Sequence, residues 1–281
     1  MSNWWKNHDD TEQVVDWAYE ALDDYGDHHM ISLGQSAAWI VHTAGMIRKH
    51  RGGQANVTYI PFSNNFLKDK SCKELLPDFE DAICKKGLCF EISDELQPSE
   101  DAKSKYFSYL SSIGASPEDI VNRYKETGQK TVMLEMIDSG KGFVSFCNLW
   151  FEESRKKFSD KEMVEAMQFH IYDQRSRGVD PLLHIKEGGV MMFPGEDYFR
   201  HELDQGHKEI MWKISSDNDL RVDSCRLVPM YSFLSGDNKK EGILLCPNEV
   251  KRKNISLHLH EAVQSKEQAR YRLSKNNSPS V

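Results

Sequence analysis

The chain alternates between short apolar runs and longer segments in which apolar residues recur every three or four positions. The short runs have the length of strands, and the longer segments have the period of helices that bury one face. Strands are predicted at 29–33, 57–62, 132–134 and 166–172, and helices at 37–50 and 143–157. This order of elements, with an insertion after the second strand, predicts an α/β fold with a doubly wound, mainly parallel sheet.

The same pattern divides the chain into a core and its additions. An acidic N-terminal helical segment is predicted at 1–27, and the core spans 28–195. A helical region is inserted at 63–127, with helices at 74–85 and 116–126; a lid over a ligand and a partner surface both fit such an insertion. Ser116, followed by a proline and two acids, is typical of a helix N-terminus. A β-rich extension follows at 196–273, and a disordered tail at 274–281.

The extension carries several strand patterns and a histidine pair. Strands are predicted at 209–214, 226–233 and 242–246, as a small sheet or as a continuation of the main one. In the run Ile255–His260, leucine and histidine alternate, which predicts another strand with His258 and His260 on one face. No third ligand follows at metal-site spacing, so solvent-facing imidazoles are favoured over a metal site. A helix is predicted at 261–273.

Two glycine-containing loops join predicted strands to predicted helices. In the second, Asp138-Ser139-Gly140 ends a strand, and a helix begins near Lys141. The first backbone N–H groups of a helix have no internal partners and point at whatever lies above the turn, which suits a phosphate group. The first loop, Leu33-Gly34-Gln35-Ser36, has the same order of strand, glycine turn and helix about a hundred residues earlier.

These two loops resemble those of type I phosphoribosyltransferases, over roughly residues 28–195. That family binds 5-phosphoribosyl 1-pyrophosphate (PRPP) with a hydrophobic strand, two acids, two variable residues and a small phosphate loop, and Glu135 to Gly142 is similar to this motif. The chain departs from it at three positions. Leu134 stands where the family has its first acid, Gly142 where a hydroxyl closes the loop, and Gln35 where a second glycine is often found.

The resemblance implies a role for each loop. Glu135 and Asp138 would face the ribose as the catalytic acids, and Leu33, Gly34, Gln35 and Ser36 would approach the pyrophosphate. The 5-phosphate would be held by the backbone of Ser139, Gly140, Lys141, Gly142 and Phe143. Mg²⁺ would be bound largely by substrate oxygens and water rather than by a protein metal site.

Three functions stay open at this point. The first is transfer of a phosphoribosyl group from PRPP to an unidentified acceptor. The second is a catalytically inactive protein of the same fold that senses a ligand or binds a protein partner, which the three departures favour. The third is an unrelated doubly wound protein that binds a nucleotide or another sugar phosphate through the Ser139 loop alone.

Composition narrows the class of protein. The formal net charge of −8 argues against nucleic-acid and anionic-membrane binding, because both depend on a positive surface. No apolar run approaches the ~20 residues that cross a bilayer, and the first ten residues lack the features of a secretion signal, so a cytoplasmic protein is expected. Two basic runs, 155–157 and 251–253, are typical of solvated surface. The six cysteines form no Cys-x-x-Cys pair, and Cys147 is expected to be a small buried residue.

Overall fold

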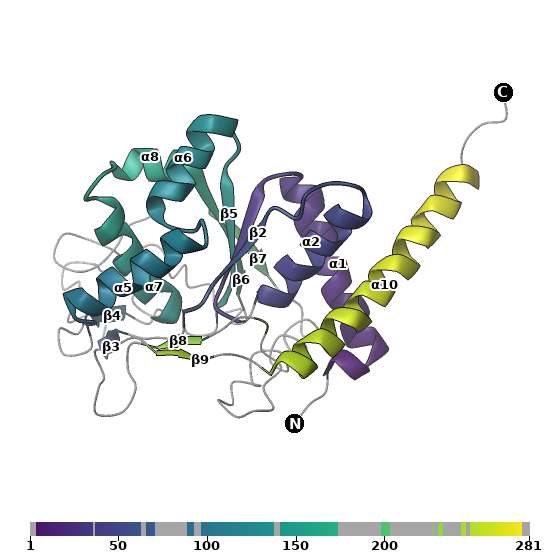
Figure 1. The fold of residues 1–281 in the computed structure, drawn as a ribbon, viewed down its shortest axis with the longest axis horizontal. Coiled ribbons are helices and arrows are strands. Elements are labelled where there is room, and N and C mark those ends of the chain that lie inside the picture. The colour runs from purple at the N-terminus through teal and green to yellow at the C-terminus, as the bar shows by residue number, and fades with distance from the viewer. Residues whose placement is uncertain are drawn as a thin grey trace, which may run out of the picture.

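A sheet of five parallel strands lies at the centre of the molecule (Figure 1). The computed structural model describes residues 4–35, 37–62, 66–70, 89–92, 97–137, 141–173, 198–202, 227, 230–232, 243–245 and 248–276. The strands of the sheet are β1 (His29–Leu33), β2 (Val57–Ile60), β5 (Thr131–Ile137), β6 (Met167–Asp173) and β7 (Tyr198–Glu202). Their order is β2-β1-β5-β6-β7, and each neighbouring pair is parallel. The predicted α/β class and the parallel pairing are therefore confirmed.

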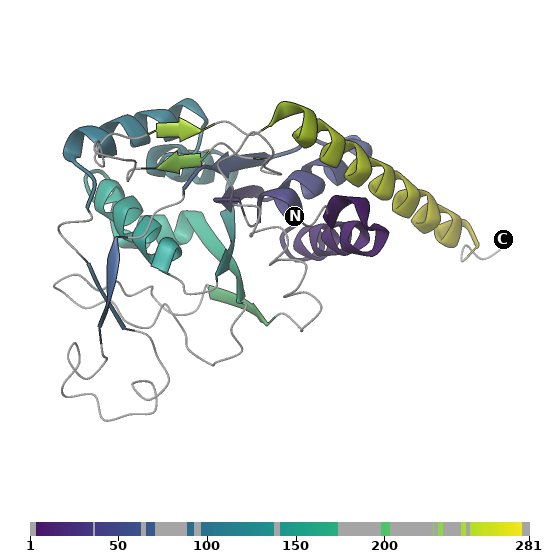
Figure 2. The same cartoon turned by 90° about the horizontal axis from the view of Figure 1, so that it is seen from below.

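Helices cover both faces of this sheet (Figures 1 and 2). One face carries α1 (His8–Tyr25), α2 (Ala38–His50) and α10 (Glu249–Asn276), and a short 3-10 helix, η1 (Trp4–Lys6), lies beside them. The other carries α5 (Glu100–Ser112), α6 (Pro117–Thr127), α7 (Lys141–Ser154) and α8 (Asp160–Ala166). Alternate residues of β5 serve the two cores: Val132 and Leu134 pack on the α1 side, and Met133 packs on the α7 side.

Local sequence signals fix the ends of several helices. The Ser116 side chain accepts a hydrogen bond from the Asp119 backbone N–H, and the Asp119 carboxylate accepts one from the Ser116 backbone N–H. Because this capping box satisfies two orphan donors and Pro117 follows it directly, α6 begins where the sequence predicted. Ser159 begins α8 with the same type of box, which the sequence analysis did not recognise.

The inserted region contributes to the core in its second half. Tyr106 and Leu110 of α5 and Ile120 of α6 are fully buried in the cluster that also contains Phe146 and Trp150 of α7. These two helices are therefore a layer of the fold rather than a separate attachment. Earlier in the insertion, β3 (Leu67–Lys70) and β4 (Cys89–Ile92) form an antiparallel pair. The helix predicted at 74–85 lies outside the described residues.

The C-terminal region is more helical than predicted. β7 continues the main sheet past residue 195, and β8 (Met230–Ser232) pairs with β9 (Ile243–Leu245) in a small antiparallel sheet. The strand predicted at 209–214 lies outside the described residues. The strand predicted at Ile255–His260 is wrong, because this run lies within α10, and the helix predicted from 261 is the second half of that same helix.

The error at α10 has a clear physical origin. Ile255, Leu259 and Val263 are fully buried at a spacing of four residues, whereas Leu257 is 55% exposed. Two residues apart on a helix, His258 and His260 point in different directions, so they do not share a face. His258 lies 3.9 Å from Glu261, and His260 is hydrogen-bonded to Gln264.

The long helix α10 crosses α1 and α2, and its C-terminal part extends beyond them (Figure 2). The Tyr19 hydroxyl donates to Glu267 at 2.6 Å, and the Arg51 guanidinium binds the same carboxylate at 2.9 Å. Arg270 stacks on the Tyr19 ring at 3.9 Å from its centroid. One carboxylate thus joins three helices. In the part of the chain that the structure describes, no helix has the length and apolar character needed to cross a bilayer.

Candidate functional site

The strand order creates a single reversal point in the sheet, between β1 and β5. From β1 the chain passes through α2 on one face to β2, whereas β5 is followed by α7 on the opposite face. The connections that leave these neighbouring strands therefore diverge at their carboxyl ends, the position at which ligands bind in doubly wound folds. Both predicted loops, 33–36 and 138–143, begin at this edge.

The first loop is shaped mainly by its contacts with the protein. Gly34 has a φ of +67°, its N–H donates to Ile60 O at 2.8 Å, and an added Cβ would lie 3.1 Å from the Phe62 carbonyl. Packing against the end of β2 is thus sufficient to require glycine here. Leu33 is buried in the α7-side core, and Gln35 Oε1 accepts a hydrogen bond from the Leu227 backbone.

The helix that follows this loop begins without a side-chain cap. Its N-cap residue is Ala37, which has no side-chain acceptor for the first backbone N–H groups of α2. A ligand or water is the usual partner for donors left in this way. Ser36, the last residue of the predicted pyrophosphate loop, lies outside the described residues.

The second loop is described only at its two ends. β5 ends at Ile137 and α7 begins at Lys141, as the sequence predicted, while Asp138, Ser139 and Gly140 lie outside the described residues. Phe143 is buried and packs edge to face on Phe169, with ring centroids 5.3 Å apart. Phe143 can therefore offer a ligand only its backbone.

Glu135 lies on β5, two residues before the strand ends at Ile137. It follows Leu134, whose partner on β1 is Ser32, and it pairs with Ile171 of β6 in register. The residue keeps partial exposure, but Oε2 is shut off from solvent and has no hydrogen-bond partner among the described residues. Burial raises the pKa of this carboxyl well above its usual range, against one hydrogen bond from the Met136 backbone. Burial therefore favours the neutral form of Glu135.

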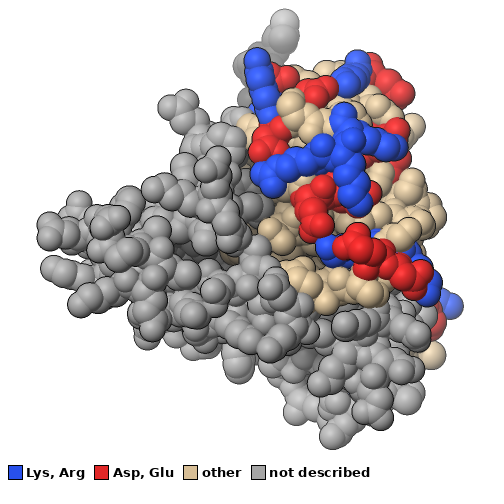
Figure 3. All heavy atoms as spheres, turned by 90° about the vertical axis from the view of Figure 1, so that its left-hand side faces the viewer, with Lys and Arg blue, Asp and Glu red and all other residues tan. Residues whose placement is uncertain are grey.

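The first basic run, 155–157, is neutralised. Arg155 pairs with Asp160 at 2.9 Å, Lys156 with Glu153 at 2.6 Å and Lys157 with Glu118 at 2.5 Å. On the described part of this face, basic and acidic side chains are interspersed (Figure 3). An anion would therefore meet cations that already have partners.

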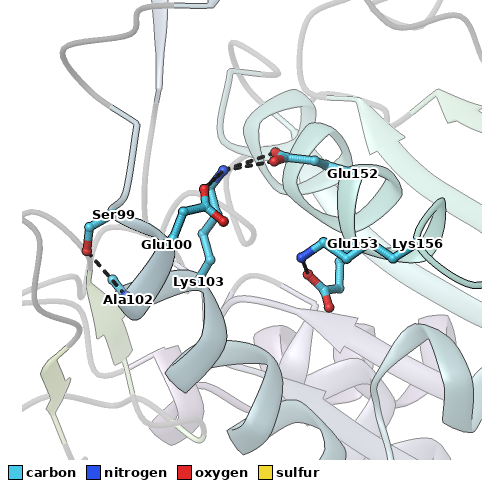
Figure 4. Close-up of polar contacts among 7 residues, drawn as sticks. All are labelled: Ser99, Glu100, Ala102, Lys103, Glu152, Glu153 and Lys156. Carbon is cyan, nitrogen blue, oxygen red and sulfur yellow. Dashed lines mark hydrogen bonds and ion pairs between the residues drawn. The ribbon is translucent and has the colours of Figure 1, made fainter.

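A hollow of about 480 Å³ between α5, α6 and α7 lies beside this run. Lys103, on its wall, bridges Glu100 and Glu152, each at 2.9 Å (Figure 4). Burial alone would lower the pKa of Lys103, but the hydrogen bonds to the two carboxylates raise it overall. The Lys103 ammonium thus stays charged and remains paired with two carboxylates. This hollow is therefore unlike an anion-binding site, which needs cations available to the ligand.

Two half-buried histidines make hydrogen bonds that the sequence analysis did not predict. His29 bonds Thr58 at 2.8 Å, and His42 lies between Tyr59 and Ser256. Desolvation and nearby arginines lower the pKa of His29 to about 3, and desolvation, Arg252 and Lys49 lower that of His42 to about 4. No local signal links His42 to Ser256, which lies 214 residues further along the chain.

No family model, curated protein or solved structure matches the chain in the three comparisons made. Among the described residues, no group of three or more His, Cys, Asp or Glu side chains is placed to hold a metal ion. Cys147 is buried and free, and burial raises the pKa of its thiol.

Proposed function

We propose that the protein binds a sugar phosphate, with PRPP as the leading candidate, at the carboxyl ends of β1 and β5. The observation that carries the proposal is the strand order β2-β1-β5-β6-β7, which puts the reversal point at the two loops whose sequences resemble PRPP-binding loops. The phosphate would bind to backbone N–H groups at the start of α7, where the helix dipole favours negative charge. The uncapped start of α2 would offer a second set of donors to the same ligand.

Glu135 favours binding without transfer. A carboxylate that helps to form a cationic sugar must be ionised and must face that sugar. Burial favours the neutral form of Glu135, and its closed-off oxygen Oε2 lies on the same side of the sheet as Cys147 of α7. A ligand-binding protein of this fold, which senses a sugar phosphate, is therefore the second candidate function. Such a protein needs no second substrate to accept a phosphoribosyl group.

Calorimetric titration tests the binding proposal directly. PRPP and ribose 5-phosphate, each with and without Mg²⁺, are expected to bind, and Gly140→Val is expected to weaken both at least tenfold, about 1.4 kcal/mol. The matched control is Gly128→Val. Gly128 has a positive φ, precedes β5 at the opposite edge of the sheet and has open space around it. Absence of binding by either ligand to the wild type contradicts the proposal.

Substitution of Glu135 separates the two candidate functions. If Glu135 is a buried neutral acid, Glu135→Gln is expected to leave ligand affinity unchanged and to stabilise the protein increasingly as pH rises. The reason is that an acid whose folded pKa is raised costs stability above its unfolded pKa. We expect the variant's advantage in urea unfolding to be larger at pH 8 than at pH 5. A tenfold or greater loss of pyrophosphate release from PRPP, with no such stabilisation, would instead support transfer.

A further inference from the structure

A second hollow, of about 570 Å³, lies at the outer edge of the sheet beside β2. Volumes of this size accommodate small organic ligands. Its apolar lining comes from β2, the end of α5 and Leu227, and includes Val57, Ile113 and the two aromatic rings of Tyr59 and Tyr109. The polar lining comes mainly from α2 and the first turns of α10.

The charges on this lining have one sign. Arg252 and Lys253 belong to the second basic run, and none of the described residues that line the hollow is acidic. Arg252 also contacts Glu249, which lies outside the lining. Lys253 is exposed and forms no ion pair within the described residues. The hollow beside α6 differs, because Glu100, Glu118 and Glu153 share its lining with the lysines. Of the two basic runs, only the second therefore faces a hollow without its own acids.

A hydrogen-bonded relay adds a neutral donor to these cations. His42 Nδ1 lies 3.0 Å from the Tyr59 hydroxyl, and Nε2 lies 3.1 Å from Ser256 Oγ. A neutral imidazole has one N–H and one acceptor nitrogen. Whichever nitrogen carries the hydrogen, one of the two hydroxyls donates to the ring and the other receives from it.

The receiving hydroxyl keeps its own hydrogen. No acceptor for that hydrogen is found among the described residues, and both Tyr59 and Ser256 line the hollow. The relay therefore presents an O–H donor to the hollow in either tautomer. The low pKa of His42 keeps the ring neutral, so the relay holds at pH 7.

From this lining we infer a second ligand site, specific for a small aromatic anion such as an aromatic carboxylate. The rings of Tyr59 and Tyr109 and the aliphatic wall would bury the apolar body, while Lys253, Arg252 and the spare hydroxyl would bind the carboxylate oxygens. The site is separate from the one proposed at the carboxyl ends of β1 and β5. Leu227 is the residue common to both, because its backbone N–H binds Gln35 and its side chain lines the hollow.

Titration calorimetry with 1-naphthoate and its neutral counterpart 1-naphthalenemethanol tests this site. The acid is expected to bind at least about tenfold more tightly than the alcohol, because hydrogen bonds to a charged group are worth roughly 1.5–3 kcal/mol. The double variant Arg252→Gln/Lys253→Gln should remove that preference, while affinity for the alcohol changes less than about twofold. Tyr59→Phe together with Ser256→Ala removes the spare donor and should weaken the acid alone.

The controls separate this site from other sources of binding. Lys275→Gln lies at the far end of α10 and should leave both affinities unchanged. Saturating ribose 5-phosphate should not displace 1-naphthoate, whether or not the sugar phosphate itself binds, so the two proposals fail independently. Inorganic phosphate should bind far more weakly than the acid. Equal binding of acid and alcohol, or unchanged binding of the acid by the folded double variant, would overturn the inference.

Discussion

Replacing Arg48 with methionine is expected to destabilise the protein by at least about 3 kcal/mol. Arg48 is 5% exposed, and its guanidinium donates to four backbone carbonyls: Ala55, Asn56, Gly26 and His28. Methionine fills most of the volume but removes the donor from the carbonyls of Ala55, Gly26 and His28, at a cost of about 1 kcal/mol each. Asn56 O keeps a second donor, the Met30 N–H at 2.9 Å. Removal of a buried charge offsets only part of this loss.

The four carbonyls lie just before β1 and just before β2, so one side chain joins the amino ends of two neighbouring strands. We therefore expect the loss to appear as a lower midpoint in urea unfolding followed by far-ultraviolet circular dichroism. Arg51→Met is the matched control. Arg51 is the C-cap residue of the same helix, but its side chain is 43% exposed, and its ion pair with Glu267 is worth at most about 1 kcal/mol. Similar losses for the two variants would contradict the role assigned to Arg48.

The elements around the reversal point of the sheet were predictable because their signals are local. β1 and α2, and β5 and α7, each combine an apolar run, a small turn and a segment of helical period, and these patterns depend only on neighbouring residues. The order in which they occur was enough to predict parallel pairing. Ser116 and Pro117 likewise indicated the start of α6 without any knowledge of tertiary contacts.

Where burial depends on distant partners, the sequence was misleading or silent. In α5, the buried positions include Lys103, which the distant Glu152 stabilises, so the apolar period of this helix is broken and the helix was missed. In α10, alternating leucine and histidine imitated a strand, although the contacts with α1 and α2 select a helical face. In such cases tertiary packing overrides the secondary structure that local propensity and hydrophobic pattern favour.

In the candidate sites, too, features with local sequence signals were predictable and features that depend on distant contacts were not. Both loops at the switch point were predicted from order and glycine placement, whereas the burial of Glu135 depends on the helix that packs above it. A glycine between a strand and a helix can be required by packing or by a ligand. At Gly34 the contact with Phe62 requires glycine with or without a ligand. His42, Tyr59 and Ser256 come from α2, β2 and α10, and only the fold brings them together.

His29 and His42 are expected to make the protein sensitive to acid. Both have pKa values in the folded state, about 3 and about 4, below the usual 6.5. The unfolded chain therefore binds protons that the folded protein excludes, and stability that is complete above pH 6.5 falls as pH drops toward these values. Together the two residues should cost about 3 kcal/mol between pH 7 and pH 5.

Comparison with His29→Gln/His42→Gln isolates this contribution. Glutamine retains hydrogen bonding to Thr58, Tyr59 and Ser256 but does not titrate, so the variant should lose markedly less stability between pH 7 and pH 5. Glu135 acts in the opposite direction, because protonation of the unfolded chain at low pH removes the cost of keeping it neutral in the folded state. Its contribution is present in both proteins and cancels in the difference. Parallel stability curves for wild type and variant would show that the two imidazoles have the same pKa in the folded and unfolded protein, and the lowered pKa assigned to His42 would then be wrong.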